Sequence, residues 1–93
     1  MKHTVVANIW DAISTTPEEA ESMKLRSALM TALKDHITAQ GWTQTDAAKR
    51  LGVTQPRVSD LTRGKISRFS LDMLVDMVAK AGLHIHVQID KAA

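Results

Sequence analysis

Apolar residues recur every three or four positions through most of the chain, which is the spacing of a helix that buries one face. The pattern predicts one long helix from Pro17 to about Gln40, capped by Thr16 and ended by Gly41. Proline suits its first position, and Glu19 completes a capping box with Thr16. The residues expected to face inward are Ala20, Met23, Leu25 or Ala28, Leu29, Ala32, Leu33 and Ile37.

Three shorter helices are predicted after Gly41, each preceded by a hydroxyl side chain that can cap it. They cover about 44–51, 55–63 and 71–81, and their expected caps are Thr43, Thr54 and Ser70. Upstream of the long helix, Asn8 is expected to cap a single helical turn.

The period changes at the end of the chain. Leu83, Ile85, Val87 and Ile89 alternate with polar residues, and this period of two predicts a strand. A single strand needs a partner, and the only other candidate in the chain is the weak one at 4–6.

Composition narrows the class of protein. The chain has 93 residues, of which 44% are hydrophobic and 24% charged, as expected for one small globular domain. It has no cysteine, which excludes disulfides, thiolate metal sites and cysteine catalysis. No apolar run approaches the ~20 residues of a membrane-spanning helix. The first residues also lack the long apolar stretch of a secretory signal, so we expect a cytoplasmic protein.

Positive charge is concentrated in the middle of the chain. Residues 44–68 contain six Lys and Arg residues against two Asp, whereas both flanking segments are slightly acidic. Such a distribution is typical of an anion-binding surface, although a solvated helical face would carry the same pattern.

Gln44 to Gly64 has the sequence form of a helix-turn-helix, in which two short helices meet across a turn that contains Gly52. The small pair Ala47-Ala48 would let these helices approach closely. Glutamine can pair with adenine and arginine with guanine. The outer face of the second of these helices carries polar groups able to reach base edges, namely Gln55, Arg57, Ser59 and Asp60.

Residues 41–65 resemble the lambdoid-repressor or XRE-type helix-turn-helix, with T-Q at both helix openings, an A-x-x-L-G centre and a G-K close. Further segments (N-I-W-D, P-E-E-A, F-S-L-D-M-L and G-L-H-I-H-V-Q-I) are similar to small HigA-like antitoxins, over about 8–89. The resemblance implies a mainly α, lambda-repressor-like fold of four to five helices with a short C-terminal β-strand. Its parts would be an N-terminal arm with one helical turn (1–16), the helix-turn-helix domain with its recognition helix at about 55–63 (17–82), and a C-terminal strand and tail (83–93).

The resemblance also implies DNA contacts. Gln44 falls at a position where the family contacts phosphate, and Gln55 at a position where it contacts a base. The next position is often a polar, base-contacting residue in the family, but here it is Pro56. We therefore expect Arg57 to make the base contact instead. Arg57 could instead contact phosphate or only solvent, and Asp60 could accept from cytosine or repel phosphate. The predicted DNA-binding residues are Gln44, Thr54, Gln55, Arg57, Ser59, Asp60, Arg63, Lys65 and Arg68.

Three further kinds of site come into question: a metal site, a catalytic site and a dimer interface. His84 and His86 would share one face of the strand, but two imidazoles without a third ligand make a poor zinc site, so we expect no metal or other cofactor. No nucleophile elbow, phosphate-binding glycine loop or metal signature indicates an enzyme. Met73 and Met77 form a second apolar face that belongs either to the core or to a dimer interface. The predicted interface residues are Met73, Met77, Leu83, Ile85 and Val87.

Two functional hypotheses follow. The first is a homodimeric, sequence-specific DNA-binding regulator, an antitoxin-type repressor that binds a palindromic operator of its own operon. The second is a protein-binding antitoxin that neutralises a RelE/HigB-like ribonuclease toxin by direct contact. The helix-turn-helix would then serve only as a scaffold.

Overall fold

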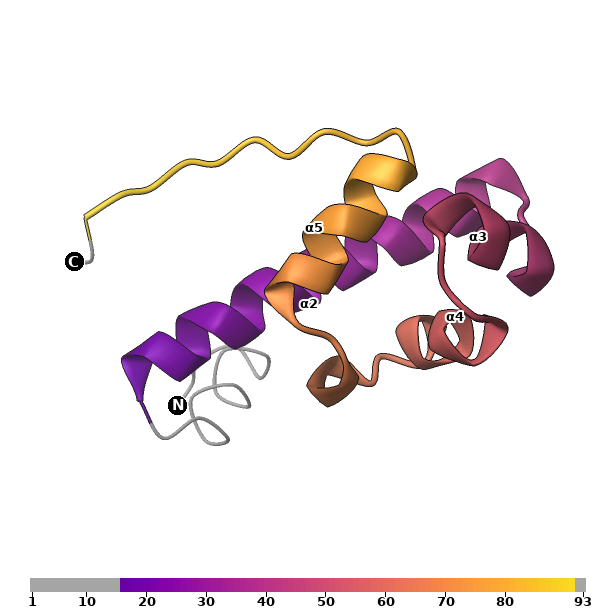
Figure 1. Cartoon of the computed structure of the whole chain (residues 1–93). Helices are drawn as coiled ribbons and strands as arrows, with labels where there is room; N and C mark the ends of the chain where they lie inside the picture. Colours follow the sequence, from indigo (N-terminus) through magenta and orange to yellow (C-terminus); the bar gives the residue numbers. More distant parts are fainter. Residues whose placement is uncertain (1–15, 92–93) are drawn as a thin grey trace, which may run out of the picture.

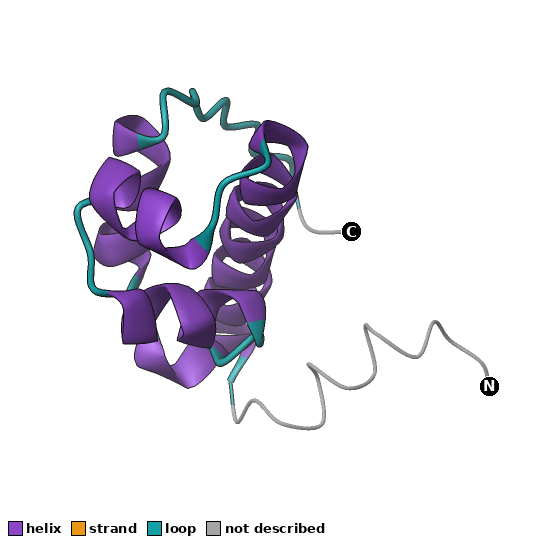
Figure 2. Cartoon of the chain, turned by 90° about the vertical axis from the view of Figure 1, so that its right-hand side faces the viewer, coloured by secondary structure: helices purple, strands orange, loops and turns teal. Residues whose placement is uncertain are grey.

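The computed structural model describes residues 16–91, which form four α-helices and one 3-10 helix (Figure 1). α5 crosses the long helix α2, α3 follows the C-terminal end of α2, and α4 packs against α3 (Figure 2). The predicted arm and its helical turn after Asn8 lie outside the described residues. In chain order the elements are α2 (Pro17–Gln40), α3 (Gln44–Leu51), α4 (Gln55–Thr62), η1 (Ile66–Arg68) and α5 (Leu71–Lys80).

Local side chains set the helix boundaries, as predicted. The hydroxyl groups of Thr16, Thr43, Thr54 and Ser70 each accept the backbone N–H of the residue three positions later. α2 ends where Gly41 adopts a φ of 67°, a conformation that costs glycine no steric clash. All four predicted starts and the predicted end of α2 are therefore confirmed.

The core lies between the C-terminal half of α2 and the shorter helices. The prediction that Leu29, Leu33 and Ile37 face inward is confirmed, but it missed Met30, which is only 5% exposed. These four residues lie along one stripe of α2, because positions three, four and seven apart share a helix face. None of the described helices combines the length and apolar character needed to cross a membrane.

The inward positions predicted on the flank of that stripe are wrong. Leu25, Ala28 and Ala32 are exposed, and Leu25 keeps 46% of its surface accessible. The spacing alone allowed a broader inward face than the neighbouring helices cover. Only the position of α4 and α5 decides which part of the apolar face is buried.

Two large core side chains come from the C-terminal third of the domain. Phe69, between η1 and α5, is 1% exposed and is among the largest fully buried side chains. Met77 on α5 is likewise 1% exposed, so its side chain packs within one chain. This agrees with the core position, one of the two that the sequence left open for Met77. Met73 is half-buried at the edge of the core.

The predicted C-terminal strand does not form in the single chain. Leu83 donates its N–H to the Val78 carbonyl, but no backbone hydrogen bond joins 84–91 to any other described residue. The segment is drawn out from α5 as an extended coil (Figure 1). Leu83 and Ile85 are half-buried against the core, whereas the apolar residues beyond them are exposed. A strand requires a hydrogen-bonded neighbour, and no described segment of the same chain supplies one.

Candidate nucleic-acid interface

α3 and α4 form a helix-turn-helix joined by Gly52, Val53 and Thr54. Gly52 ends α3 with a φ of 69°, and Val53 donates its N–H to the Ala48 carbonyl. Ala47 is completely buried, so its small side chain allows the close approach that the sequence predicted. The turn is therefore built by glycine geometry and small-residue packing together.

The two helices present glutamines at their first positions. Gln44 begins α3 and Gln55 begins α4, and both are exposed. Each follows a threonine cap, beside backbone N–H groups that have no partner within the helix. The Thr54 hydroxyl oxygen accepts from the Arg57 N–H at 3.3 Å, which leaves its own hydrogen free to donate. Both helix starts therefore offer amide side chains and N–H donors to an anion.

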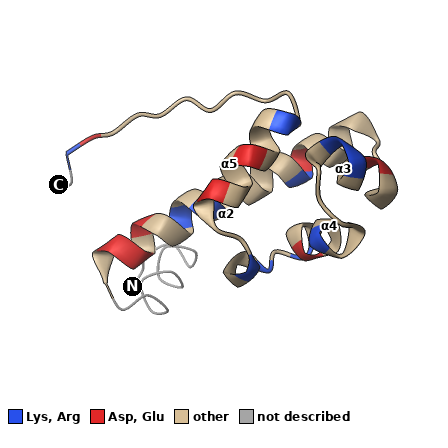
Figure 3. Ribbon diagram, viewed as in Figure 1, with Lys and Arg blue, Asp and Glu red and all other residues tan. Residues whose placement is uncertain are grey.

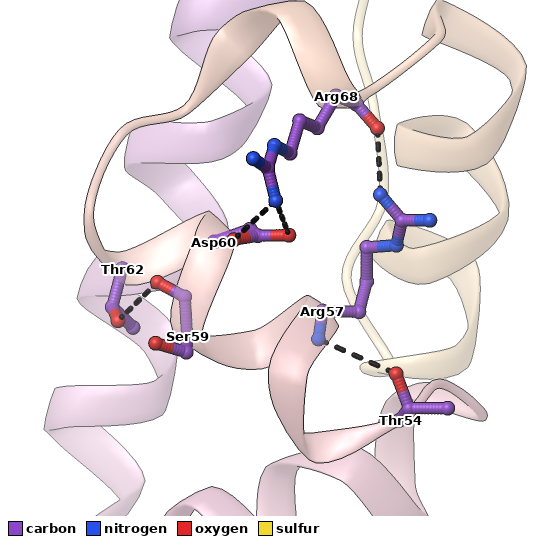
Figure 4. Close-up of polar contacts among 6 residues, drawn as sticks. All are labelled: Thr54, Arg57, Ser59, Asp60, Thr62 and Arg68. Carbon is purple, nitrogen blue, oxygen red and sulfur yellow. Dashed lines mark hydrogen bonds and ion pairs between the residues drawn. The ribbon is translucent and has the colours of Figure 1, made fainter.

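Arg57 does not extend freely from α4. Its guanidinium donates to the Arg68 carbonyl at 2.8 Å (Figure 4). The guanidinium also lies 5.4 Å from the centre of the Phe69 ring. The half-buried side chain thus connects the recognition helix to the segment that follows it. The sequence analysis placed Arg57 on the outer face of the helix and did not predict these contacts.

Asp60 is also occupied. Its carboxylate lies 3.4 Å from the Arg68 guanidinium, and only 13% of its side chain is exposed, against 56% for Arg68 (Figure 4). Asp60 therefore holds the guanidinium of Arg68, while Arg57 binds the backbone carbonyl of Arg68. The structure brings together three of the predicted DNA-binding residues as one network.

Arg26 of α2 is a further part of the site that sequence analysis missed. Its guanidinium donates to the Phe69 carbonyl at 3.2 Å and to the Ile66 carbonyl at 3.5 Å. These bonds tie the connection that contains η1 to the long helix. The available signal was its position: Arg26 lies three residues before Leu29 and seven before Leu33, on the stripe that faces the core.

The remaining predicted contacts differ in accessibility. Ser59 is half-buried, and its backbone carbonyl accepts from the Thr62 hydroxyl at 3.2 Å. Arg63 is exposed and Lys65 is half-buried. Neither forms an ion pair with any residue in the described range. Their charges are therefore available to a ligand.

Positive charge is concentrated in the helix-turn-helix and the segment after it. Lys and Arg outnumber Asp and Glu from α3 to the connection after α4, whereas α2 and α5 carry both signs with a small excess of acidic residues (Figure 3). Arg50, like Arg57, packs on an aromatic ring: its guanidinium lies 5.1 Å from the centre of the Trp42 ring. The helix-turn-helix is thus the basic half of the protein.

The two histidines of the tail lie close together. The rings of His84 and His86 are 4.8 Å apart and nearly perpendicular. Within 16–91, no three side chains of the metal-binding types His, Cys, Asp and Glu come together as a metal-binding group.

Comparisons with known proteins agree with this geometry. A family model described as a helix-turn-helix domain matches residues 14–90. A solved structure named "Putative XRE Family Transcriptional Regulator" is similar, with a TM-score of 0.72 and 31% sequence identity. The similarity covers 80% of this chain and 83% of that one. None of the curated proteins matches the chain.

Proposed function

The chain belongs to the helix-turn-helix domain family, and from this premise we propose that it is a DNA-binding transcriptional regulator. The observation that carries the proposal is the pair of exposed glutamines, Gln44 and Gln55, at the capped starts of α3 and α4. They stand in the basic half of the molecule, where side chains can reach base edges and N–H groups can reach phosphate. The name of the similar solved structure supports the same function.

In this proposal α4 enters the major groove. Gln55 and Arg57, the two neighbours of Pro56, contact base edges, whereas Pro56 has no N–H to donate. Ser59, one turn further along α4, contacts the adjacent part of the operator. For Arg57 to reach a guanine, its guanidinium exchanges the Arg68 carbonyl for the base. That exchange replaces one hydrogen-bond acceptor by two, since guanine offers both O6 and N7.

The sequence-independent contacts go to phosphate. The donors or positive charges come from the start of α3 (Gln44), the cap of α4 (Thr54) and the segment after α4 (Arg63, Lys65 and Arg68). Asp60 acts differently, because its carboxylate is largely buried against Arg68. We assign it the task of holding Arg68 in place rather than that of reading a base.

The test of DNA binding uses the region upstream of the protein's own gene. Replacement of Lys65 by Ala should weaken binding to every sequence and reduce the slope of log affinity against log salt by about one, because one phosphate contact is lost. Arg68→Ala should do the same. Affinity is measured by fluorescence anisotropy over a series of salt concentrations.

Lys24→Ala is the matched control, since Lys24 is an exposed lysine of α2 outside the helix-turn-helix. It should leave the slope unchanged. A change of base preference with an intact slope in Lys65→Ala would refute the assignment of Lys65 to phosphate.

We also propose that the regulator is a homodimer that binds a palindromic operator. The support is the C-terminal segment, whose backbone is unpaired within the described chain and whose apolar side chains Val87 and Ile89 are 76% and 88% exposed. An extended segment of this kind pairs readily with another strand. Two joined helix-turn-helix domains would present their α4 helices to two half-sites.

The dimer predicts the effect of charge on that apolar face. Val87→Asp combined with Ile89→Asp should give a monomer at micromolar concentration where the wild type is a dimer, because buried carboxylates would have no partner. Sedimentation velocity measures the difference. Gln88→Asp, on the polar face of the same segment, should remain dimeric; a wild type that sediments as a monomer would refute the dimer itself.

The antitoxin role is the finer part of the proposal. It rests on the sequence similarity to HigA-like antitoxins and on the exposed apolar residue Leu25, which a protein partner could cover. A small basic toxin-like reading frame beside the gene would favour a repressor that also neutralises a RelE/HigB-like ribonuclease. Without such a neighbour, DNA binding alone would remain as the function.

A further inference from the structure

An apolar groove lies between α5 and the start of the C-terminal segment. It has a volume of about 230 Å³, and His84 is the only polar residue in its lining. The other lining residues are Val75, Val78, Ala79, Leu83 and Ile85. Val75 on its rim is 43% exposed, so the apolar surface beside α5 is only partly covered by the chain's own tail.

The tail passes this groove and leaves two apolar side chains without cover. Leu83 and Ile85 are half-buried against the core, but Val87 and Ile89, which share their face of the extended segment, are exposed. The single chain therefore carries an unfilled apolar groove and, a few residues further on, apolar side chains with no site to fill.

The pattern of the tail is symmetric about His86. Apolar residues stand one and three positions from it on both sides, and polar residues stand two positions away, at His84 and Gln88. An antiparallel second copy centred on His86 would place every apolar residue opposite an apolar one: Ile85 opposite Val87 of the second copy, and Leu83 opposite its Ile89. Any shift by one residue would bring apolar residues opposite polar ones.

We propose that the tails of two copies pair antiparallel about His86, so that the end of each tail covers the groove of the other copy. This inference rests on the proposed homodimer and specifies its interface. Val87 and Ile89 of the second copy then lie beside Ile85 and Leu83, which line the groove. The backbone groups left unpaired at 84–89 gain hydrogen-bonded partners in the same step.

The charge of the segment is compatible with self-pairing. No Lys, Arg, Asp or Glu occurs between Lys80 and Asp90, so two copies bring no permanently like charges opposite each other. The imidazoles of His84 and His86, whose ring centres are 4.8 Å apart, belong to the polar positions of the ribbon. A second copy is thus a partner whose pattern, length and charge all match the tail.

Cysteine cross-linking tests the register directly, because the chain has no cysteine of its own. Residues directly opposite in an antiparallel pair have Cα atoms about 4.5–5.5 Å apart, within the range that a disulfide spans. In the full-length protein, His86→Cys should therefore shift on mild oxidation from the mass of one chain to that of two, as measured by non-reducing electrophoresis and mass spectrometry. His86 is exposed, so the substitution should not disturb the fold.

His84→Cys and Gln88→Cys are the matched controls. In this register each lies four residues along the ribbon from its own copy, roughly 14 Å away, so neither should link to itself. A mixture of these two variants should link, since position 84 lies opposite position 88. The combination of self-linking at 86 and mixed linking at 84 with 88 is the result expected.

Other outcomes separate the two proposals. A dimer by sedimentation in which the His86→Cys chains do not link would overturn this register and leave the homodimer standing. Self-linking at all three positions would indicate parallel or non-specific pairing and also overturn it. A monomer in solution would refute the homodimer and the register together.

Discussion

Replacement of Phe69 by Ala is expected to lower the free energy of unfolding by about 3–5 kcal/mol, the range for removing a buried aromatic side chain. Phe69 is 1% exposed and lies in the connection between η1 and α5. Its loss would open a cavity in the core and remove the ring beneath Arg57. A domain of this size has a total stability of only about 5–15 kcal/mol, so the effect is a large share of the whole. Urea denaturation followed by circular dichroism measures it.

Two control variants should lose less stability than Phe69→Ala. Phe69→Leu keeps an apolar side chain in the core and should cost clearly less. Leu25→Ala removes a side chain that is 46% exposed and should cost little. A loss for Phe69→Ala no larger than that for Leu25→Ala would contradict the core position of Phe69.

Replacement of Arg57 by Ala is expected to relax base preference at one position of each half-site. A bidentate arginine–guanine contact contributes about 1–3 kcal/mol of discrimination. A palindromic operator would lose about twice as much as a single half-site, because the dimer repeats the contact. Affinity for non-specific DNA should fall only slightly. The measurement is a base-substitution series on the operator with wild type and variant.

Arg57→Lys is the matched control, because lysine keeps the charge but lacks the planar fork of donors. It should retain non-specific affinity and still lose the discrimination. If wild type and Arg57→Ala rank all bases alike, Arg57 keeps its contacts with the Arg68 carbonyl and the Phe69 ring on DNA. Its part would then be to position Arg68, and Gln55 would be the base-reading residue of α4.

The geometry at Arg57 shows why part of the candidate site could not be predicted. The positions of Gln44 and Gln55 could be predicted from the sequence, because a threonine cap depends only on the N–H three residues later and so marks the next residue as the first of the helix. The contacts of Arg57 and Asp60 with Arg68 join residues eleven and eight positions apart, from α4 to the end of η1. No periodic pattern describes such a connection.

The sequence by itself determined the local features of this protein. Helix starts at Thr16, Thr43, Thr54 and Ser70 depend on hydrogen bonds within four residues, and the turn at Gly52 depends on one residue's backbone freedom. Both are encoded where they occur, so they could be predicted without any knowledge of the fold. The alternation at the end of the chain likewise indicated an extended segment with one apolar face.

Only the tertiary structure decided which apolar faces are covered and which charges are engaged. Leu25 and Met30 are both large apolar residues of α2, yet the neighbouring helices bury only Met30. The Arg26 guanidinium donates to the Phe69 carbonyl 43 residues away, and the Met77 side chain packs in the core, one of the two places that the sequence had left open for it. The extended tail remains a coil because a strand exists only where another segment pairs with it. In each case the physical reason is the same: burial and pairing depend on which distant residues arrive at the site, and spacing along the chain does not specify that.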